Sequence, residues 1–193
     1  TIDADIQRIA EEASAKLGKG AVVITEVPDC KIRALCSLPD FEPSQIGRAA
    51  QSQDSPLVNR AFCAYAPGSV FKLVTAAVEL ESGPLLRDFT CTGALNAGGM
   101  LFHCFDGQSH GQVDLAGAIE KSCNCYFISA ARAIGGQPVL SMAYNLGLGA
   151  GQEFGRGLFM NAGALPQGDA LENARALANF SFGQGEVSVT PLQ

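Results

Sequence analysis

Helix-like, strand-like and loop-like stretches alternate along this chain. Over residues 3–17 apolar side chains recur every three or four positions, acidic residues come first and Gly18 follows, which predicts a helix. Residues 21–25 form a β-branched run, and residues 31–37 form a second one after a proline-containing turn. This pattern predicts an antiparallel hairpin. A helix packed on a hairpin is the start of an α+β sandwich.

Further along, polar loops separate several helical patterns. Residues 39–60 are rich in Pro, Ser, Gln and Asp and are interpreted as a surface loop. Residues 88–112 are interpreted as an irregular excursion with a small hairpin, and residues 152–168 as a loop. Helices are predicted over residues 69–81, 115–121, 124–134, 139–146 and 169–179. The pattern as a whole predicts an α/β layer with an inserted helical part.

Composition narrows the class of protein. The chain has 193 residues, of which 47% are hydrophobic and 17% charged, so it is long and apolar enough for one sizeable core. A net charge of −6 without a cluster of Lys and Arg gives no reason to expect nucleic acid or an anionic lipid surface as a partner. No apolar run approaches the roughly 20 residues of a membrane span, and the N-terminus lacks the pattern of a signal peptide.

One short segment carries the first chemical signal. Pro67 and Gly68 form a turn, and Ser69 and Lys72 follow three residues apart at the start of a predicted helix. Residues i and i+3 share a helix face, so the Lys72 amine can reach the Ser69 oxygen. A partly desolvated lysine loses its proton more easily and can activate a serine for acyl transfer. In isolation, a helix-capping serine followed by a solvated lysine would be the more ordinary interpretation.

A second segment lies 53 positions after Ser69. Ser122 and Asn124 offer a further hydroxyl for proton relay and a carboxamide that can bind a peptide-like substrate. A polar turn between two helices would have the same sequence. Other segments of the chain support the functional interpretation of these two motifs.

Several segments along nearly the whole chain resemble the transpeptidase domain of penicillin-binding proteins. Besides the Ser-x-x-Lys and Ser-x-Asn motifs, the resembling segments are residues 1–7 (TIDADIQ), 20–24, 32–41 (IRALCSLPDF), 59–61, 110–111, 118–119, 122–127, 183–185 (GQG) and 190–193 (TPLQ). They occur in the family's order. The monofunctional class B type is favoured, because no Arg-Gln precedes Pro67 and Leu73 stands where the bifunctional type usually has proline.

The resemblance also shows a departure. The family's third motif, Lys-(Ser/Thr)-Gly, normally follows on a later strand, and this chain ends at Gln193 without it. Residues 81–83 and 91–93 are the nearest strings, and both are interpreted as loops. We therefore expect a domain truncated before that motif. Loss of one oxyanion-hole donor lowers the rate of a serine hydrolase by roughly 100–1000-fold, so activity of the truncated chain is in doubt.

The resemblance implies a fold and a division of the chain. The fold class is α+β of the β-lactamase/transpeptidase type, with an antiparallel sheet flanked by helices and an all-helical subdomain. Residues 1–193 form a partial transpeptidase domain. Its α/β part covers about residues 1–87 and continues beyond residue 193, and its helical subdomain covers about residues 113–180.

The function implied is that of a serine-type peptidoglycan D,D-transpeptidase. Lys72 as a neutral amine takes the proton of Ser69, and Ser69 attacks the D-Ala-D-Ala end of a stem peptide. Ser122 passes a proton to the departing D-Ala, and Asn124 aligns the substrate. The expected partners are stem peptides and β-lactam antibiotics, with proteins of a cell-division or elongation complex. A non-catalytic β-lactam sensor or scaffold, a serine β-lactamase and a structural division module stay open as alternatives.

The resemblance also implies a location on the extracytoplasmic face of the bacterial membrane. The parent protein is expected to be anchored there through an N-terminal segment that precedes this chain. No cofactor and no metal are expected.

Cysteine is unusually frequent in such a domain. The chain has seven cysteines, no Cys-x-x-Cys pair and only two histidines, a pattern that does not indicate a zinc site. Cys91 and Cys104 flank a glycine-rich loop and are the candidate disulfide for an oxidising compartment. Cys123 and Cys125 are interpreted as small buried hydrophobes. Cys123 is not expected to be a nucleophile, because no histidine neighbours it in the sequence.

Overall fold

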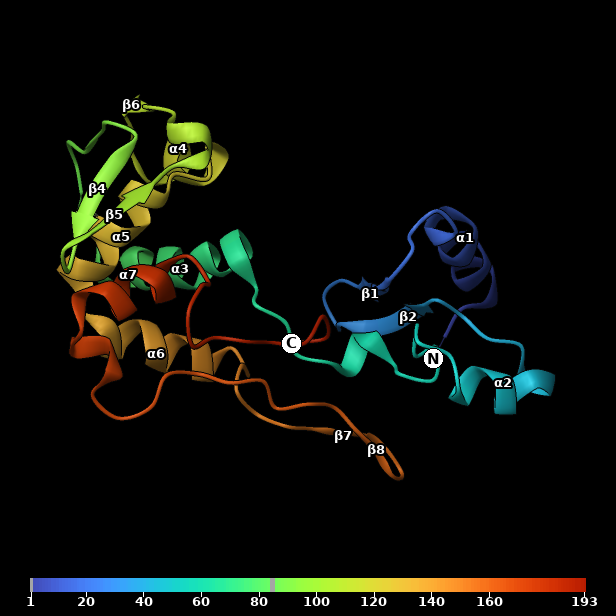
Figure 1. Ribbon diagram of the computed structural model, residues 1–193. Helices are drawn as coiled ribbons and strands as arrows, with labels where there is room; N and C mark the ends of the chain where they lie inside the picture. Colours follow the sequence, from blue (N-terminus) through green and yellow to red (C-terminus); the bar gives the residue numbers. More distant parts are fainter. Residues whose placement is uncertain (1, 84–85) are drawn as a thin grey trace. The chain divides into compact units, whose positions relative to one another are not determined.

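The computed structural model describes residues 2–83 and 86–193, which fold into two compact units (Figure 1). The first unit comprises Thr1–Tyr65, Gly151–Asn161 and Thr190–Gln193, and the second comprises Ala66–Ala150 and Ala162–Val189. Within the described residues, no helix combines the length and apolar character needed to cross a membrane.

The first unit is built on the predicted helix and hairpin. Strand β1 (Gly20–Glu26) pairs antiparallel with β2 (Lys31–Leu38), and helix α1 (Ala4–Ser14) packs on β2. Asp3 caps α1 by accepting hydrogen bonds from two backbone N–H groups at 3.1 Å. The helix ends three residues earlier than predicted. Its start and both strands lie where the hydrophobic pattern placed them.

The packing of α1 on β2 rests on a small core and on one amide side chain. Ala10, Ala34 and Cys36 are buried between the two elements. Gln7 donates to the carbonyl of Leu35 at 3.2 Å and accepts from its N–H at 2.9 Å. The helix is thus bonded to the backbone of the strand, as well as packed on it.

Two segments interpreted as loops contain short regular elements. Residues 39–60 include the 3₁₀ turn Pro43–Gln45 and helix α2 (Ile46–Ala50). Residues 152–168 include the strands β7 (Glu153–Gly155) and β8 (Leu158–Phe159), joined by a tight turn. The interpretation as loops was wrong for these elements, because they are too short for a periodic pattern to reveal.

The second unit is a helical bundle. Its main helices are α3 (Lys72–Ser82), α4 (Leu115–Glu120), α5 (Asn124–Ile134), α6 (Gly136–Asn145) and α7 (Ala174–Ser181). All five predicted helical segments are present, although α6 begins three residues earlier than predicted. Phe71 and Phe180 pack in the core with ring centroids 4.8 Å apart. Residues 81–82 end α3, so their interpretation as a loop was wrong.

Two buried polar contacts tie α3 to its neighbours. Thr75 donates from its hydroxyl to the carbonyl of Ser181 at 3.0 Å, which joins α3 to the end of α7. Tyr126 donates to Glu79 Oε1 at 2.7 Å, which joins α5 to α3. The other oxygen, Glu79 Oε2, is buried and has no hydrogen-bond partner among the described residues. The position of α3 is therefore fixed by buried hydrogen bonds on two sides.

The excursion over residues 88–112 contains the predicted hairpin and a second strand pair. Strand β4 (Ala94–Ala97) pairs with β5 (Met100–His103), and β3 (Thr90–Cys91) pairs with β6 (Gly111–Gln112). Phe102 and Ala97 bury their side chains against Ile128 of α5 and Ala178 of α7. The excursion is therefore packed onto the helical bundle.

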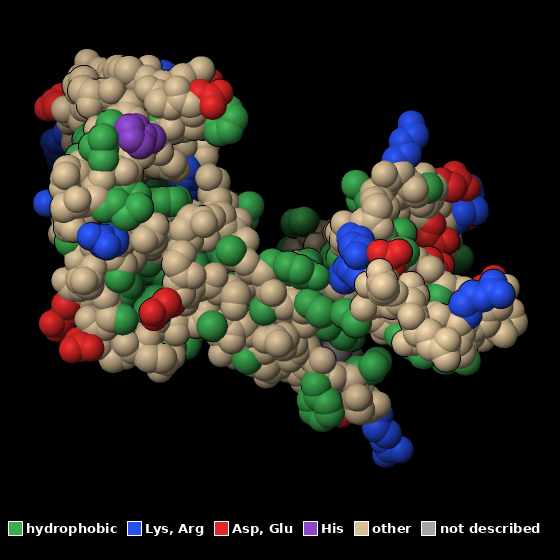
Figure 2. Space-filling model, viewed as in Figure 1, with side chains coloured by type: hydrophobic (Ala, Val, Ile, Leu, Met, Phe, Trp, Pro, Cys, Tyr) green, Lys and Arg blue, Asp and Glu red, His purple; other side chains and the backbone are tan. Residues whose placement is uncertain are grey.

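The helices and antiparallel strands confirm the predicted α+β class. The predicted domain limits, about residues 1–87 and 113–180, concern the complete domain and stay a prediction. Within this chain, residues 66–87 group with the helical unit. On the face shown in Figure 2, acidic and basic side chains are interspersed on both units, with no basic cluster gathered on that face.

Candidate active site

Ser69 lies at the beginning of a helical segment, as the sequence predicts. The first turn is a 3₁₀ helix, Gly68–Phe71, and α3 follows directly at Lys72. Gly68 has a φ of 59°, a backbone conformation that glycine adopts readily and that other residues disfavour. The turn thus presents an exposed serine hydroxyl at the N-terminus of a helix, where developing negative charge is stabilised.

Lys72 is the buried centre of the site. Its side chain is 3% exposed, and its Nζ lies 3.1 Å from Ser69 Oγ and 2.8 Å from Ser122 Oγ. The amine also donates to the carbonyl oxygen of Ser122 at 2.7 Å. Burial lowers the pKa of Lys72 to about 8. About a tenth of the amine is therefore neutral at pH 7, which is the form that can accept a proton.

Ser122 occupies the link between α4 and α5 in a strained conformation. Its φ is 48°, in the left-handed region that non-glycine residues rarely adopt. In this conformation both its hydroxyl and its carbonyl oxygen lie within hydrogen-bond distance of the Lys72 amine. Strain of this kind, of order 1–3 kcal/mol, is common at functional sites.

Asn124 is the first residue of α5, two positions after Ser122. Its side-chain amide donates to the carbonyl of His103 at 2.8 Å, which ties the start of α5 to the end of β5. The structure therefore brings Ser69, Lys72 and Ser122 into one hydrogen-bonded group and holds Asn124 beside it through another contact. The carbonyl oxygen of its carboxamide can accept a hydrogen bond from an amide N–H.

The segment Gly183–Gly185 supports the serine turn. Gly68 donates its N–H to the carbonyl of Gly183 at 2.9 Å. A Cβ on Gly183 would lie 2.2 Å from the carbonyl oxygen of Gly68 and 2.7 Å from Phe71 Cβ, and the φ of Gly183 is 77°. The residue must be glycine for this close approach. Sequence reasoning noted the Gly-Gln-Gly segment as part of a resemblance and missed its contact with the serine turn.

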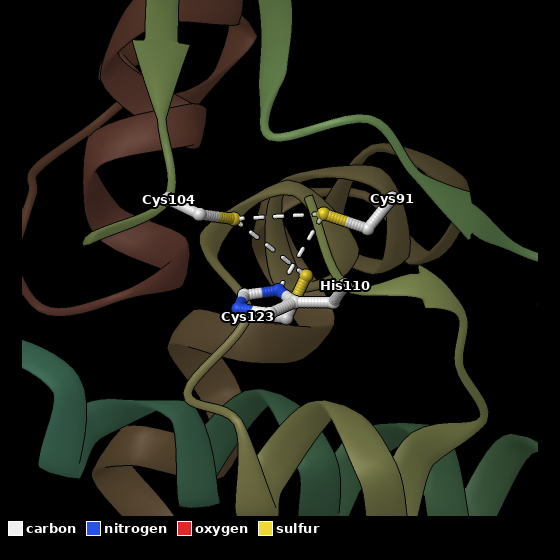
Figure 3. Close-up of side chains that lie close together, drawn as sticks. All are labelled: Cys91, Cys104, His110 and Cys123. Atoms are coloured by element: carbon white, nitrogen blue, oxygen red, sulfur yellow. Dashed lines mark hydrogen bonds between the residues drawn. The ribbon is translucent and has the colours of Figure 1, made fainter. Parts of the chain in front are cut away.

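A cluster of thiols with one imidazole includes Cys123, the residue that follows Ser122 (Figure 3). It consists of Cys91, Cys104, His110 and Cys123, whose ligand atoms all lie within 4.8 Å of one another. Burial raises the pKa of Cys123 to about 12, which argues against a nucleophilic role. We expected no histidine beside Cys123, and this expectation was wrong. His110, which comes from another segment of the chain, lies in the same cluster.

The predicted disulfide between Cys91 and Cys104 is not formed. Both residues are buried free thiols, and their Sγ atoms lie 3.7 Å apart, well beyond the roughly 2.05 Å of a disulfide bond. Their proximity agrees with the prediction, whereas their bonding does not. Sequence reasoning missed the third thiol and the histidine, because they arrive from separate segments.

The serine–lysine–serine group can perform acyl transfer. A hydroxyl in hydrogen-bond contact with a buried amine of lowered pKa is a nucleophile with its general base. The second hydroxyl, 2.8 Å from the same amine, is a group through which a proton can pass. These three residues are contributed by α3, its preceding turn and the α4–α5 link.

Comparisons with known proteins give one consistent result. The family model described as "Penicillin binding protein transpeptidase domain" matches residues 20–193. The chain is 32% identical to "Peptidoglycan D,D-transpeptidase PbpA" of Mycolicibacterium smegmatis, over 91% of this chain and 39% of that protein. It is 30% identical to "Stage V sporulation protein D" of Bacillus subtilis, over 100% of this chain and 31% of that protein. The chain thus spans well under half of these relatives.

Solved structures show the same likeness. The structure of penicillin-binding protein A from M. tuberculosis as a penicillin G acyl-enzyme complex matches with a TM-score of 0.87 and 29% identity. The match covers 99% of this chain and 48% of that one. The predicted transpeptidase-like fold class is thereby confirmed.

Proposed function

Because the chain belongs to the penicillin-binding protein transpeptidase domain family, we propose that it carries the nucleophile and the general base of a peptidoglycan D,D-transpeptidase. The observation that carries the proposal is the buried Lys72 amine in contact with two serine hydroxyls. The class B subtype stays a prediction. The relatives that are named as D,D-transpeptidases support the reaction class.

In the proposed acylation, Ser69 Oγ attacks the carbonyl of the penultimate D-Ala of a stem peptide. The proton of Ser69 moves to neutral Lys72 Nζ, 3.1 Å away, and a tetrahedral oxyanion forms. The backbone N–H of Ser69, at the helix start, stabilises that oxyanion. The C–N bond then breaks, the terminal D-Ala leaves with a proton delivered through Ser122, and an ester on Ser69 remains.

In the second half-reaction, an amine of a neighbouring strand attacks the ester. Lys72 and Ser122 take the proton of the incoming amine, the ester C–O bond to Ser69 breaks as the new amide bond, which is the cross-link, forms, and the proton returns to Ser69 Oγ. The Ser122 hydroxyl is suited to this role because it lies 2.8 Å from the Lys72 amine and is exposed. Asn124 aligns the substrate through its carboxamide. No cofactor enters the scheme.

The parent protein is proposed to act on the extracytoplasmic face of the membrane, where its substrate lies. Stem peptides and β-lactams are its proposed small-molecule partners, and division or elongation proteins its proposed macromolecular ones. A solved relative carrying penicillin G as an acyl-enzyme supports the β-lactam assignment.

The test is release of D-alanine from a synthetic peptide ending in D-Ala-D-Ala, with and without an added D-amino acid as acceptor. We expect D-alanine from the native chain, a ligated product when the acceptor is present, and neither from Ser69→Ala. Release of D-alanine by Ser69→Ala would overturn the assignment of the nucleophile. Rapid hydrolysis of a β-lactam would indicate a β-lactamase. Acylation of Ser69 by a β-lactam without any turnover would indicate a sensor.

A further inference from the structure

The thiol cluster gathers four potential ligands from four separate segments. Cys91 ends β3, Cys104 follows β5, His110 precedes β6 and Cys123 precedes α5. The three cysteines are at most 3% exposed, and the histidine is half-buried. The three thiols and the imidazole contact one another: Cys91 Sγ lies within hydrogen-bond distance of Cys104 Sγ and His110 Nδ1, and Cys104 Sγ of Cys123 Sγ.

Three distances within the cluster match those of a tetrahedral metal site, and no two of its ligand atoms lie more than 4.8 Å apart. Cys104 Sγ lies 3.7 Å from Cys91 Sγ and 3.8 Å from Cys123 Sγ, and Cys91 Sγ lies 3.5 Å from His110 Nδ1. Zinc binds sulfur at about 2.3 Å and imidazole nitrogen at about 2.0–2.1 Å, so tetrahedral ligands lie about 3.8 Å apart for two sulfurs and about 3.6 Å apart for sulfur and nitrogen. These three pairs are thus already spaced as ligands of one central ion.

The backbone around the cluster supplies donors for thiolates. The N–H of Gly93 points at Cys91 Sγ at 3.4 Å, and the N–H of Tyr126 points at Cys123 Sγ at 3.4 Å. Hydrogen bonds from outside the ligand set to the ligand atoms are characteristic of built metal sites. They also stabilise the deprotonated sulfur that a metal requires.

We propose that Cys91, Cys104, His110 and Cys123 form a structural zinc site of the Cys₃His type. All four tetrahedral positions are filled by side chains, which is the pattern of structural zinc, since catalytic zinc keeps one position open. The soft thiolate set favours zinc over magnesium or calcium. The pattern escaped sequence reasoning because its ligands follow one another at spacings of 13, 6 and 13 residues, with no Cys-x-x-Cys pair.

A disulfide between Cys91 and Cys104 is the main competing state of the same thiols. It would consume two of the four groups and leave Cys123 and His110 buried beside it without a role. The Sγ–Sγ distance of 3.7 Å fits two ligands of one metal ion and is far too long for a covalent bond. The observed geometry therefore favours the metal.

The proposed site has a consequence for the neighbouring serine and asparagine. Cys123 lies in the chain between Ser122 and Asn124, and Asn124 is bonded to the carbonyl of His103, the residue before Cys104. A metal ion would hold the Cys123 backbone to the excursion over residues 88–112. Cys104 and Cys123 are positioning residues in this scheme, because they touch neither substrate nor the reacting atoms.

The first test is the metal content of the chain folded with zinc and without chelator, measured by mass spectrometry of the elements. We expect one zinc ion per chain, and on replacement by Co²⁺ the absorption bands of tetrahedral thiolate-bound cobalt. Cys104→Ser and His110→Gln are expected to weaken zinc binding by more than the 10–100-fold that loss of an outer contact causes. Cys36→Ser, which removes a buried thiol from β2, and Cys63→Ser should retain the ion.

A chain that stays free of zinc, or zinc retained by both ligand variants, would overturn the proposal. A measurement on the unmodified chain guards against variants that fail to fold. Bound zinc should protect Cys91, Cys104 and Cys123 from iodoacetamide and leave the exposed Cys30 reactive. Equal alkylation with and without zinc, or a Cys91–Cys104 disulfide in the zinc-treated chain, would contradict the site.

The positioning role has its own readout. Zinc should slow amide hydrogen exchange over residues 122–126 and leave α6 unchanged, and its removal should lower the rate at which a β-lactam acylates Ser69. Unchanged exchange over residues 122–126 would contradict positioning. The acylation measurement rests on the proposed function, whereas the measurements of metal content and amide hydrogen exchange do not. Failure of one proposal can therefore be distinguished from failure of the other.

Discussion

Two polar clusters contain the consecutive residues Ser122 and Cys123, one in each, and they differ in almost every physical property. One joins the exposed Ser69 and Ser122 hydroxyls to a buried amine. The other gathers thiols and an imidazole that are largely closed to solvent. The hydroxyl-bearing residues of the first are exposed to solvent, as a reaction with a substrate requires. The second is closed, as a structural site requires.

The two clusters also differ in how they are encoded. Ser69 and Lys72 sit three residues apart on one helical segment, so their contact follows from helix geometry alone. The thiol cluster forms only where four separate segments of the chain meet, and no residue spacing within any one segment predicts it. A site formed within one helical segment can therefore be predicted from this sequence, whereas a site assembled by tertiary packing cannot.

Lys72→Met should separate function from stability most strongly. Loss of the general base is expected to lower the rate of Ser69 acylation by about 10²–10⁴-fold. Thermal stability at pH 7 should stay the same or rise, because an ammonium that is 3% exposed is replaced by an apolar side chain. Acylation kinetics and thermal unfolding measure the two effects. Lys121→Met, at an exposed neighbouring position, should change neither, and a normal rate for Lys72→Met would remove the amine from the mechanism.

Gly183→Ala should damage the serine turn through the backbone. The new Cβ would lie 2.2 Å from the Gly68 carbonyl oxygen at a φ of 77°. We expect a loss of about 2–5 kcal/mol in the free energy of unfolding, from left-handed strain and overpacking together. Denaturant unfolding gives the value.

Gly147→Ala is the matched control for that variant. Gly147 also has a positive φ, 84°, but nothing lies within 4 Å of its added Cβ. It should lose only the strain, about 1–2 kcal/mol. Equal losses for the two variants would show that the contact with Gly68 carries no weight.

The pH dependence of acylation should report the buried amine. Burial lowers the pKa of Lys72 to about 8, and only the neutral amine accepts the proton of Ser69. The rate should therefore rise with pH, by about 90-fold between pH 6 and pH 9, and level off above the pKa. Mass spectrometry of samples quenched at successive times, repeated across this pH range, measures the acylation rate. A flat profile, or an inflection near the ordinary lysine pKa of about 10.4, would contradict the assignment.

Tyr126→Phe tests the tie between α3, which begins with Lys72, and α5, which directly follows Cys123. The change removes the donor to Glu79 Oε1 and leaves a buried carboxyl without a partner among the described residues. The expected loss is about 1–3 kcal/mol in the free energy of unfolding. Tyr144→Phe, at an exposed position, should lose almost nothing. Adding Glu79→Gln to Tyr126→Phe should restore part of the loss, and no restoration would place the effect elsewhere.

The fold was predictable wherever local pattern dominates. Helix α1, strands β1 and β2 and helix α5 lie close to their predicted limits, because each has a clear period and a cap or a turn at its end. Helix α2 and strands β7 and β8 were missed, because elements of two to five residues have no period to detect.

Of the candidate site, the sequence predicted the residues but not their arrangement. The proximity of Ser122 to Lys72 spans 50 positions, and only the resemblance to a family linked the two motifs. The role of Gly183 in holding the serine turn and the positive φ of Ser122 are consequences of tertiary packing. The bond from Asn124 to the carbonyl of His103 is another. Such contacts cannot be predicted from composition or from the spacing of residues in the sequence.

The most direct test of the central claim is the intact mass of the chain after incubation with benzylpenicillin, with Ser69→Ala alongside. We expect the native chain to gain the mass of one penicilloyl group, mapped to the peptide that contains Ser69, and the variant to gain nothing. An unmodified native chain, or the same adduct on Ser69→Ala, would contradict the account of Ser69 as the nucleophile.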